Sequence, residues 1–243
     1  MAGHSKWSNI KRKKEKTDTQ RAKIFTKIGR EIAVAVKQGG PDPTLNAKLR
    51  DAIAKGKANN VPNDNLERII KKAAGEGDDQ NYEEIIYEGY GPSGVAVIIE
   101  TLTENRNRTV ADIRHYFDKY SGNMGQSGCV SFMFNRQGVL AIDREGVDED
   151  KLMEDALDAG ADDLLTEEGI YVIQTESTDF GAVRDALEAK GYTFLSAEIE
   201  FVPSVFTKLT DEDDIKNMEK MLEMFEDNDD VQAVWHNWEM DEE

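Results

Sequence analysis

The segment from residue 138 to residue 202 carries an order of strands and helices that few folds can accommodate. Short runs rich in β-branched and apolar residues predict strands at 138–143, 161–166, 169–176 and 193–202. Helical periodicity is found at 148–159 and 178–190. The order is therefore strand, helix, strand, strand, helix, strand, which is the split βαβ order of a ferredoxin-like fold. We expect one ferredoxin-like α/β domain over residues 137–203.

The segments on either side of this unit supply the same kinds of element in a permuted order. Strands are predicted at 82–90, 94–102, 128–135 and 229–238, and helices at 106–120 and 210–226. We therefore expect residues 81–136 and 204–243 to form one discontinuous α/β domain, into which the ferredoxin-like unit is inserted. The fold class that we expect is α+β, with an N-terminal three-helix domain followed by two ferredoxin-like α/β units, the second inserted into the first.

Residues 1–80 read as a basic helical domain with three helices. The first runs from about Asp18 to Gln38, and its apolar residues recur at helical spacing. The second is expected to begin with Asp42 as N-cap and Pro43 at its first position. The third follows Val61-Pro62-Asn63 and ends at Gly75.

Charge is distributed very unevenly along the chain. Residues 1–75 contain 18 Lys and Arg against 7 Asp and Glu, whereas residues 76–243 contain 12 against 42, so the net charge of −19 conceals a strongly basic first third. Such asymmetry is typical of a basic module that docks on nucleic acid while an acidic body stays out of contact.

The basic residues gather on an N-terminal arm and on one side of the first helix. On a helical wheel Lys23, Lys27 and Arg30, together with Lys37, fall within about 80° of one another, opposite the apolar side. The arm adds Lys6, Lys11, Arg12, Lys13, Lys14 and Lys16. These cations would suit a phosphate backbone, although a basic helix face can also simply be solvated. Trp7 could stack on an unpaired base, or staple the arm to the helices.

A second candidate site lies at 103–114, where a strand leads into a helix. With Asn105 as N-cap, Arg106 and Arg108 would flank free backbone amides, which favours anion binding. Thr109 is an alternative cap, and the arginines could instead meet nearby carboxylates. The glycine-rich segment 89–94 lacks the Lys-Ser/Thr ending of a phosphate loop and is predicted to be a hairpin turn. We interpret 121–128 as a helix-to-strand loop.

No motif for catalysis, for a cofactor or for a metal is found. The three histidines are scattered, and neither EF-hand spacing nor a nucleophile motif occurs. We therefore expect a non-enzymatic protein with no cofactor. No apolar run is long enough for a membrane span, and the single Cys129 indicates a reducing, cytoplasmic location.

The residues separate RNA from DNA only weakly as the expected partner. A net charge of −19 suits a shaped polyanion that one end of the protein enters, such as folded RNA, better than scanning of duplex DNA. The third helix begins with Asn63, Asp64 and Asn65, and this acidic leading end is poorly suited to a major groove. Other modes of DNA binding stay open.

Several motifs resemble those of the YebC/PmpR family. They are MAGHSKW at the start, RAKIFTK at 21–27, YEGYGPSGVA at 87–96, NRNRTVADIR at 105–114, and the later SGN and GCVSFMF. The resemblance covers essentially the whole chain, and AGHSKW is its most specific part. One departure is Ser121-Gly122, where many members have two glycines.

The resemblance implies a helical N-terminal domain, two α/β domains and a role in gene expression. Members have been described as DNA-binding transcriptional regulators, and also as translation factors that help the ribosome through difficult sequences such as proline runs. Mitochondrial members include a translational activator of cytochrome c oxidase. The implied partner is the ribosome and its RNA, with promoter DNA as the alternative. Positions that match the family motifs are Gly3, His4, Ser5, Lys6, Trp7, Arg21, Lys23, Lys27, Asn105, Arg106, Asn107 and Arg108.

Overall fold

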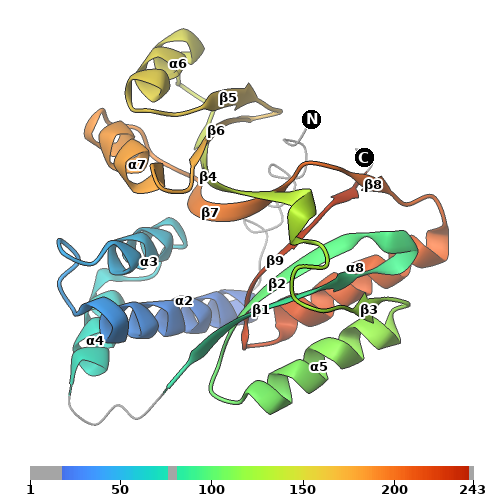
Figure 1. The fold of residues 1–243 in the computed structure, drawn as a ribbon. Coiled ribbons are helices and arrows are strands. Elements are labelled where there is room, and N and C mark those ends of the chain that lie inside the picture. Colours follow the sequence, from blue (N-terminus) through green and yellow to red (C-terminus); the bar gives the residue numbers. More distant parts are fainter. Residues whose placement is uncertain (1–17, 76–80, 241–243) are drawn as a thin grey trace.

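The computed structural model describes residues 18–75 and 81–240, and Figure 1 shows their arrangement. Three helices come first: α2 (Asp18–Gly39), α3 (Ala47–Ala58) and α4 (Asn63–Ala74). They pack around one apolar cluster whose centre is Ile28, Ile32 and Leu49, each at most 1% exposed. The i, i+4, i+8 spacing of Ile24, Ile28 and Ile32 places all three on the inner side of α2.

The predicted start of the second helix is wrong. Asp42 forms a local turn, accepting hydrogen bonds from the backbone N and the hydroxyl of Thr44, and α3 begins four residues later. Its N-cap is Asn46, whose side chain accepts from Leu49 N and donates to the carbonyls of Ala35 and Gly40. This buried amide satisfies backbone groups of α2 and α3 together. Leu45, in the turn before α3, is 85% exposed.

The first sheet has the strand order β3-β1-β2-β9. Its strands are β1 (Glu83–Tyr90), β2 (Ala96–Thr103), β3 (Asn123–Met124) and β9 (Val231–His236), and all pairs are antiparallel. The helices α5 (Arg106–Lys119) and α8 (Glu212–Asp227) cover one face, where Ile113, Phe117 and Phe225 pack against Val97 and Ile99. Pro92–Gly94 joins β1 to β2, so the predicted hairpin is confirmed.

The second sheet lies between β3 and α8 in the chain and has the order β5-β6-β4-β7. Its elements are β4 (Phe134–Asp143), α6 (Glu149–Asp158), β5 (Asp163–Thr166), β6 (Ile170–Glu176), α7 (Phe180–Ala189) and β7 (Ser196–Pro203). This is the antiparallel order of a ferredoxin-like unit, as expected from residues 138–202. Short strands β8 (Thr207–Lys208) and β10 (Trp238–Glu239) pair with each other beyond it.

The predicted strand at 128–135 is not formed as expected. Glu88, which is 5% exposed, accepts hydrogen bonds from the backbone N of Gly128, Val130 and Ser131, so these amides are not available for a sheet ladder. The loop is fixed to β1 instead, and the third strand of the first sheet is only Asn123–Met124. β4 then begins at Phe134, which pairs with Pro203 of β7.

Apolar packing joins the two sheets to each other. Ala96, Ile98 and Phe134 form one cluster with Phe201 and Trp235, from strands of both sheets. We call the two sheets with their helices the α/β body, and α2–α4 the helical unit. We propose that the domains have the boundaries expected from the sequence: 1–80, 81–136 with 204–243, and 137–203. Within the described residues, no helix has the length and hydropathy needed to cross a membrane.

Candidate nucleic-acid interface

The cationic face of α2 consists of Lys23, Lys27 and Arg30. Their i, i+4 and i+7 spacing directs the three side chains to the same side of the helix. Ile28 and Ile32 point the other way, into the helical core. α2 therefore has an apolar side and a cationic side, as its periodicity predicts.

This cationic face contacts residues 226–230, which connect α8 to β9 and which we call the acidic turn. Lys23 Nζ lies 2.8 Å from Asp227 Oδ1, and Lys27 Nζ donates to the carbonyl of Glu226 at 2.8 Å. Arg30 donates to the carbonyl of Asp229 at 2.7 Å. Figure 1 shows one end of α2 beside the end of α8 that leads into β9.

The end of a helix explains why cations gather here. The last carbonyl groups of α8 have no partner within the helix, and its dipole makes this end negative. The last turn of α8 contains no basic residue of its own. Residues 226–230 add four carboxylates to these carbonyls. The compensating cations therefore come from α2, about 200 residues away in the chain.

Asp230 connects the acidic turn to three other elements. This carboxylate is 3% exposed and accepts hydrogen bonds from Arg30, Arg108 and Thr109, and from Thr103. Burial by itself would raise the pKa of Asp230, but the hydrogen bonds from Arg108, Thr109 and Arg30 outweigh it, and the pKa is lowered. The ionised carboxylate thus joins α2, the end of β2 and the start of α5.

The sequence does not say what lies against the cationic face of α2, and the structure places part of the acidic body there. Opposite charges on two parts of one chain attract each other as they attract external ions, and here the docked partner is internal. Docking leaves Lys23 about a third exposed and Arg30 less so. Nucleic-acid binding by Lys23, Lys27 and Arg30 remains a prediction. Any nucleic acid that binds them has to compete with the acidic turn for the same side chains.

The start of α5 is the second predicted anion site. Asn105 is the N-cap, since its side chain accepts from Arg108 N, so Thr109 is not the cap. Arg108 pairs with Asp230, which is the carboxylate alternative left open by the sequence. Its pKa is raised by the hydrogen bond to Asp230. Arg106 and Asn107 are exposed beside it.

Of the remaining predicted residues, Arg21 is the one that lies within the described part of the chain. Arg21 is exposed and has an interaction of its own. The positions of the N-terminal arm lie outside the described residues; they are Gly3, His4, Ser5, Lys6, Trp7, Lys11, Arg12, Lys13, Lys14 and Lys16.

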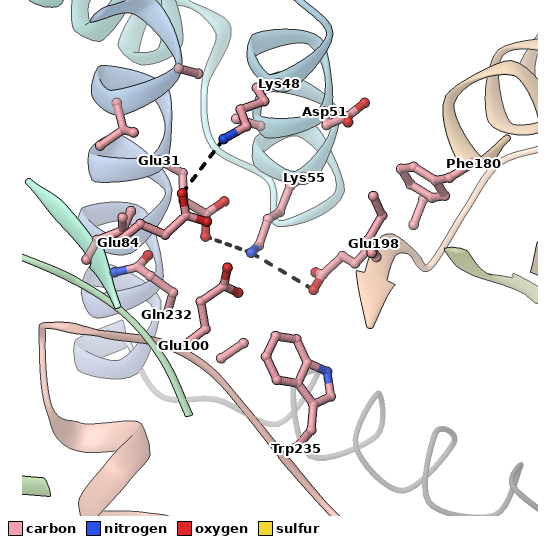
Figure 2. A pocket seen from close by; sticks show the side chains of 17 residues that line it. Glu31, Lys48, Asp51, Lys55, Glu84, Glu100, Phe180, Glu198, Gln232 and Trp235 are labelled. Carbon is pink, nitrogen blue, oxygen red and sulfur yellow. Dashed lines mark hydrogen bonds and ion pairs between the residues drawn. The ribbon is translucent and has the colours of Figure 1, made fainter. Parts of the chain in front are cut away.

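A cleft of about 200 Å³ lies where the helical unit meets both sheets (Figure 2). Lys55 of α3 projects into it, with Nζ 2.8 Å from Glu31 and 3.9 Å from Glu198 of β7. Burial would lower the pKa of Lys55, but the carboxylates of Glu198 and Glu31 reverse this, and the pKa is raised. Glu100 of β2 lies nearby, and burial raises its pKa to about 7.

Sequence reasoning did not find Asp230, Glu100 or Glu88 as important residues. Each is one carboxylate among many in an acidic chain, and no spacing marks it. The run Glu-Asp-Asn-Asp-Asp at 226–230, directly after a helical pattern without a basic last turn, was the available signal for the acidic turn. Within residues 18–75 and 81–240, no group of three or more His, Cys, Asp or Glu side chains could hold a metal ion.

Together these features define a three-part α+β protein in which a basic helical unit is docked on an acidic α/β body. The chain belongs to the TACO1/YebC family. The model of the N-terminal domain of that family matches residues 5–76, and the model of its second and third domains matches residues 82–238.

Relatives and a solved structure agree over nearly the full length. A probable transcriptional regulatory protein of Ruminiclostridium cellulolyticum is 60% identical, over 100% of this chain and 98% of the relative. Another of that name, from Caldicellulosiruptor bescii, is 58% identical over 100% of both chains. The crystal structure of a conserved hypothetical protein from Aquifex aeolicus superposes with a TM-score of 0.84 at 43% identity, covering 94% of each chain. Family and relatives indicate a regulatory protein.

Proposed function

We propose that this protein is a non-enzymatic, nucleic-acid-binding regulator of gene expression whose basic N-terminal unit contacts phosphate groups. One observation supports this most: the boundary between net positive and net negative sequence, near residue 75, coincides with the boundary between the helical unit and the α/β body. A uniformly acidic protein would be repelled by a polyanion. A basic unit at one end allows contact while the acidic body remains on the far side.

The preferred target is RNA in the ribosome, where the protein would help elongation through difficult sequences such as proline runs. Two features support RNA over duplex DNA. The net charge of −19 opposes non-specific binding along DNA. The exposed leading end of α4 contains Asp64 and Glu67, and carboxylates there would approach the phosphates of a major groove.

Promoter DNA is the second candidate. The name of the relatives from Ruminiclostridium cellulolyticum and Caldicellulosiruptor bescii supports it, because both are called probable transcriptional regulatory proteins. In either case we propose a cytoplasmic protein whose arm, residues 1–16, supplies most of the phosphate contacts, assisted by Arg106 and Asn107 at the start of α5.

Charge removal on the arm tests the proposal. We expect replacement of Lys6, Lys11, Arg12, Lys13 and Lys14 by Gln to reduce cosedimentation with ribosomes at moderate salt, because each lost phosphate contact weakens binding. The melting temperature should not change. Replacement of Arg68, Lys71 and Lys72 on the exposed side of α4 is the control. Cosedimentation of the arm variant at the wild-type level would refute the role of the arm.

A deletion strain separates the two targets. Ribosome profiling should show pauses at particular codon runs if the protein acts in translation. Altered promoter output with normal elongation, together with a mobility shift of promoter DNA by the purified protein, would instead support the DNA candidate.

A further inference from the structure

The helical unit is held on the α/β body by charged groups and not by a shared apolar core. The apolar cluster of the helical unit contains only residues between Ile24 and Ala73. Among the described residues, no apolar cluster joins it to either sheet, whereas the two sheets share the cluster around Phe134 and Trp235. Polar interfaces of this kind permit domains to move relative to one another.

Ion pairs cross this boundary in several places. They are Lys23–Asp227, Arg30–Asp230, Lys48–Glu84, Arg50–Asp185, Lys55–Glu198 and Arg184–Asp51. In all but the last the cation belongs to the helical unit. The interface therefore follows the charge asymmetry of the sequence, with the acidic body acting as the counterion of the basic unit.

The strength of these pairs differs from the edge to the centre of the contact. Lys23 and Asp227 are 34% and 67% exposed, so salt screens their attraction and its net contribution is small. The side chains of Arg30 and Asp230 are 19% and 5% exposed, so salt screens the attraction between them much less. Lys23, at the edge of the contact, can thus exchange its partner more easily than Arg30 at the centre.

The acidic turn offers the cationic face the same chemistry as a nucleic-acid backbone. Lys23, Lys27 and Arg30 bind carboxylate and carbonyl oxygens at 2.7–2.8 Å, and phosphate oxygens accept the same charge-assisted hydrogen bonds. In the docked unit these donors are already bound to oxygens of the acidic turn. A phosphate backbone must displace the acidic turn to reach them.

We propose that the acidic turn is an internal competitor of polyanions for the cationic face of α2, so that binding of a polyanion releases the helical unit from the α/β body. With nucleic acid as the polyanion, this rests on the proposed function. The undocked helical unit then presents the cationic face, which the acidic turn contacts in the docked unit.

The first test weakens the competitor without touching the cationic face. Glu226→Gln with Asp227→Asn removes the carboxylate of the Lys23 pair and lowers the charge of the turn. We expect poly(U) RNA to bind this variant about threefold more tightly, the size expected for loss of one exposed ion pair. Glu219→Gln with Glu223→Gln removes the same charge from exposed positions on the same helix and should bind as the wild type does. Equal affinities of the two variants would overturn the proposal.

The second test measures release directly. Dyes are attached at Ala58→Cys on α3 and Leu157→Cys on α6, both exposed, in a Cys129→Ser background that leaves no other thiol. We expect poly(U), heparin and raised ionic strength each to change the energy-transfer efficiency, and the Glu226→Gln, Asp227→Asn background to show part of this change without ligand.

The outcomes separate this proposal from the proposed function. Tight poly(U) binding with unchanged energy transfer would overturn competition and leave the nucleic-acid function intact. A response to heparin and salt without poly(U) binding would support competition and count against RNA as the partner. Absence of any polyanion binding would overturn both.

Discussion

Asp230 is the residue on which the contact between the helical unit and the body depends most. It receives two guanidinium groups and two hydroxyl groups at a position that is 3% exposed. A buried carboxylate with this many donors stabilises the fold only while it is ionised, and removing it leaves Arg30 and Arg108 without the carboxylate that balances their charge.

We predict that Asp230→Asn lowers the free energy of unfolding by about 3 kcal/mol, in the range found when one partner of a buried pair is lost. Urea unfolding followed by circular dichroism measures this, with Asp229→Asn, at an exposed neighbour, as control. Because the pKa of Asp230 is lowered in the folded protein, its contribution is present above its unfolded value near 3.8 and is lost as the pH falls through the folded value. The free energies of unfolding of Asp230→Asn and Asp229→Asn should therefore become equal in acid. Equal stability at neutral pH would contradict the role of Asp230.

The contribution of Glu100 to stability depends on pH in the opposite direction. Burial, with Glu31 and Glu84 nearby, raises its pKa from 4.5 to about 7, although Lys55 and Arg136 oppose the shift. The folded protein then binds a proton that the unfolded chain releases, so stability is present at low pH and is lost as the pH rises from about 4.5 to about 7.

We predict that Glu100→Gln removes this loss, so that its effect on the free energy of unfolding is about 3 kcal/mol more favourable at pH 8 than at pH 4, since one pKa unit corresponds to about 1.4 kcal/mol. Thermal melting of the variant and wild type across this range is the measurement. Glu219→Gln, on the exposed side of α8, should show no such dependence. A gain in stability of Glu100→Gln that is the same at every pH would mean that Glu100 does not titrate in the cleft.

At the scale of elements, one side chain, that of Glu88, makes several of the hydrogen bonds that hold the loop between β3 and β4. Glu88 accepts three backbone N–H groups from residues 128–131, at 2.8–2.9 Å. A glycine-containing segment that would otherwise be mobile thereby becomes an ordered connection between the two sheets. Cys129 lies in it, and burial raises the pKa of its thiol.

We predict that Glu88→Gln frees this loop, because an amide has one acceptor oxygen where the carboxylate has two. The expected result is faster amide exchange at residues 125–131 and several-fold faster reaction of Cys129 with a thiol reagent, while exchange in β1 and β2 changes little. Cys129 is the only cysteine, so the reaction has no background. Glu83→Gln, exposed on the same strand, is the control. Unchanged Cys129 reactivity would show that the loop is held by other contacts.

At the scale of the whole molecule, the helical unit has a core of its own. Ile32 is fully buried within it, and the cluster contains no residue of the α/β body. Local stability can therefore differ between the unit and the body.

We predict that Ile32→Ala destabilises the helical unit by about 2–4 kcal/mol, as is usual for a large buried residue. Amide exchange should accelerate in α2, α3 and α4, while the central strands β2 and β4 keep their protection. Ile142→Ala, at a similarly buried position in β4, should give the reverse pattern and serves as control. Equal acceleration in both regions after Ile32→Ala would mean that the chain unfolds as a single cooperative unit.

The sequence by itself determined the elements and their grouping. The helices at 18–39, 106–119 and 212–227 lie within two residues of their predicted ends, because amphipathic periodicity and caps are local properties. The order of strands and helices in residues 138–202 was enough to predict the ferredoxin-like unit. The wrong predictions concern places where contacts outside the local segment decide. Asn46, which also binds carbonyls at the end of α2, replaces Asp42 as the cap of α3, and Glu88 of β1 removes the strand expected at 128–135.

The partner of the cationic face was decided only by tertiary structure. Helical spacing places Lys23, Lys27 and Arg30 on one side of α2, but it does not say what lies opposite that side. Their neighbours are residues 226–230, about 200 positions further along the chain. A charge pattern in the sequence fixes the sign of the surface, whereas the choice between solvent, phosphate and the protein's own carboxylates depends on which parts of the chain the fold brings together.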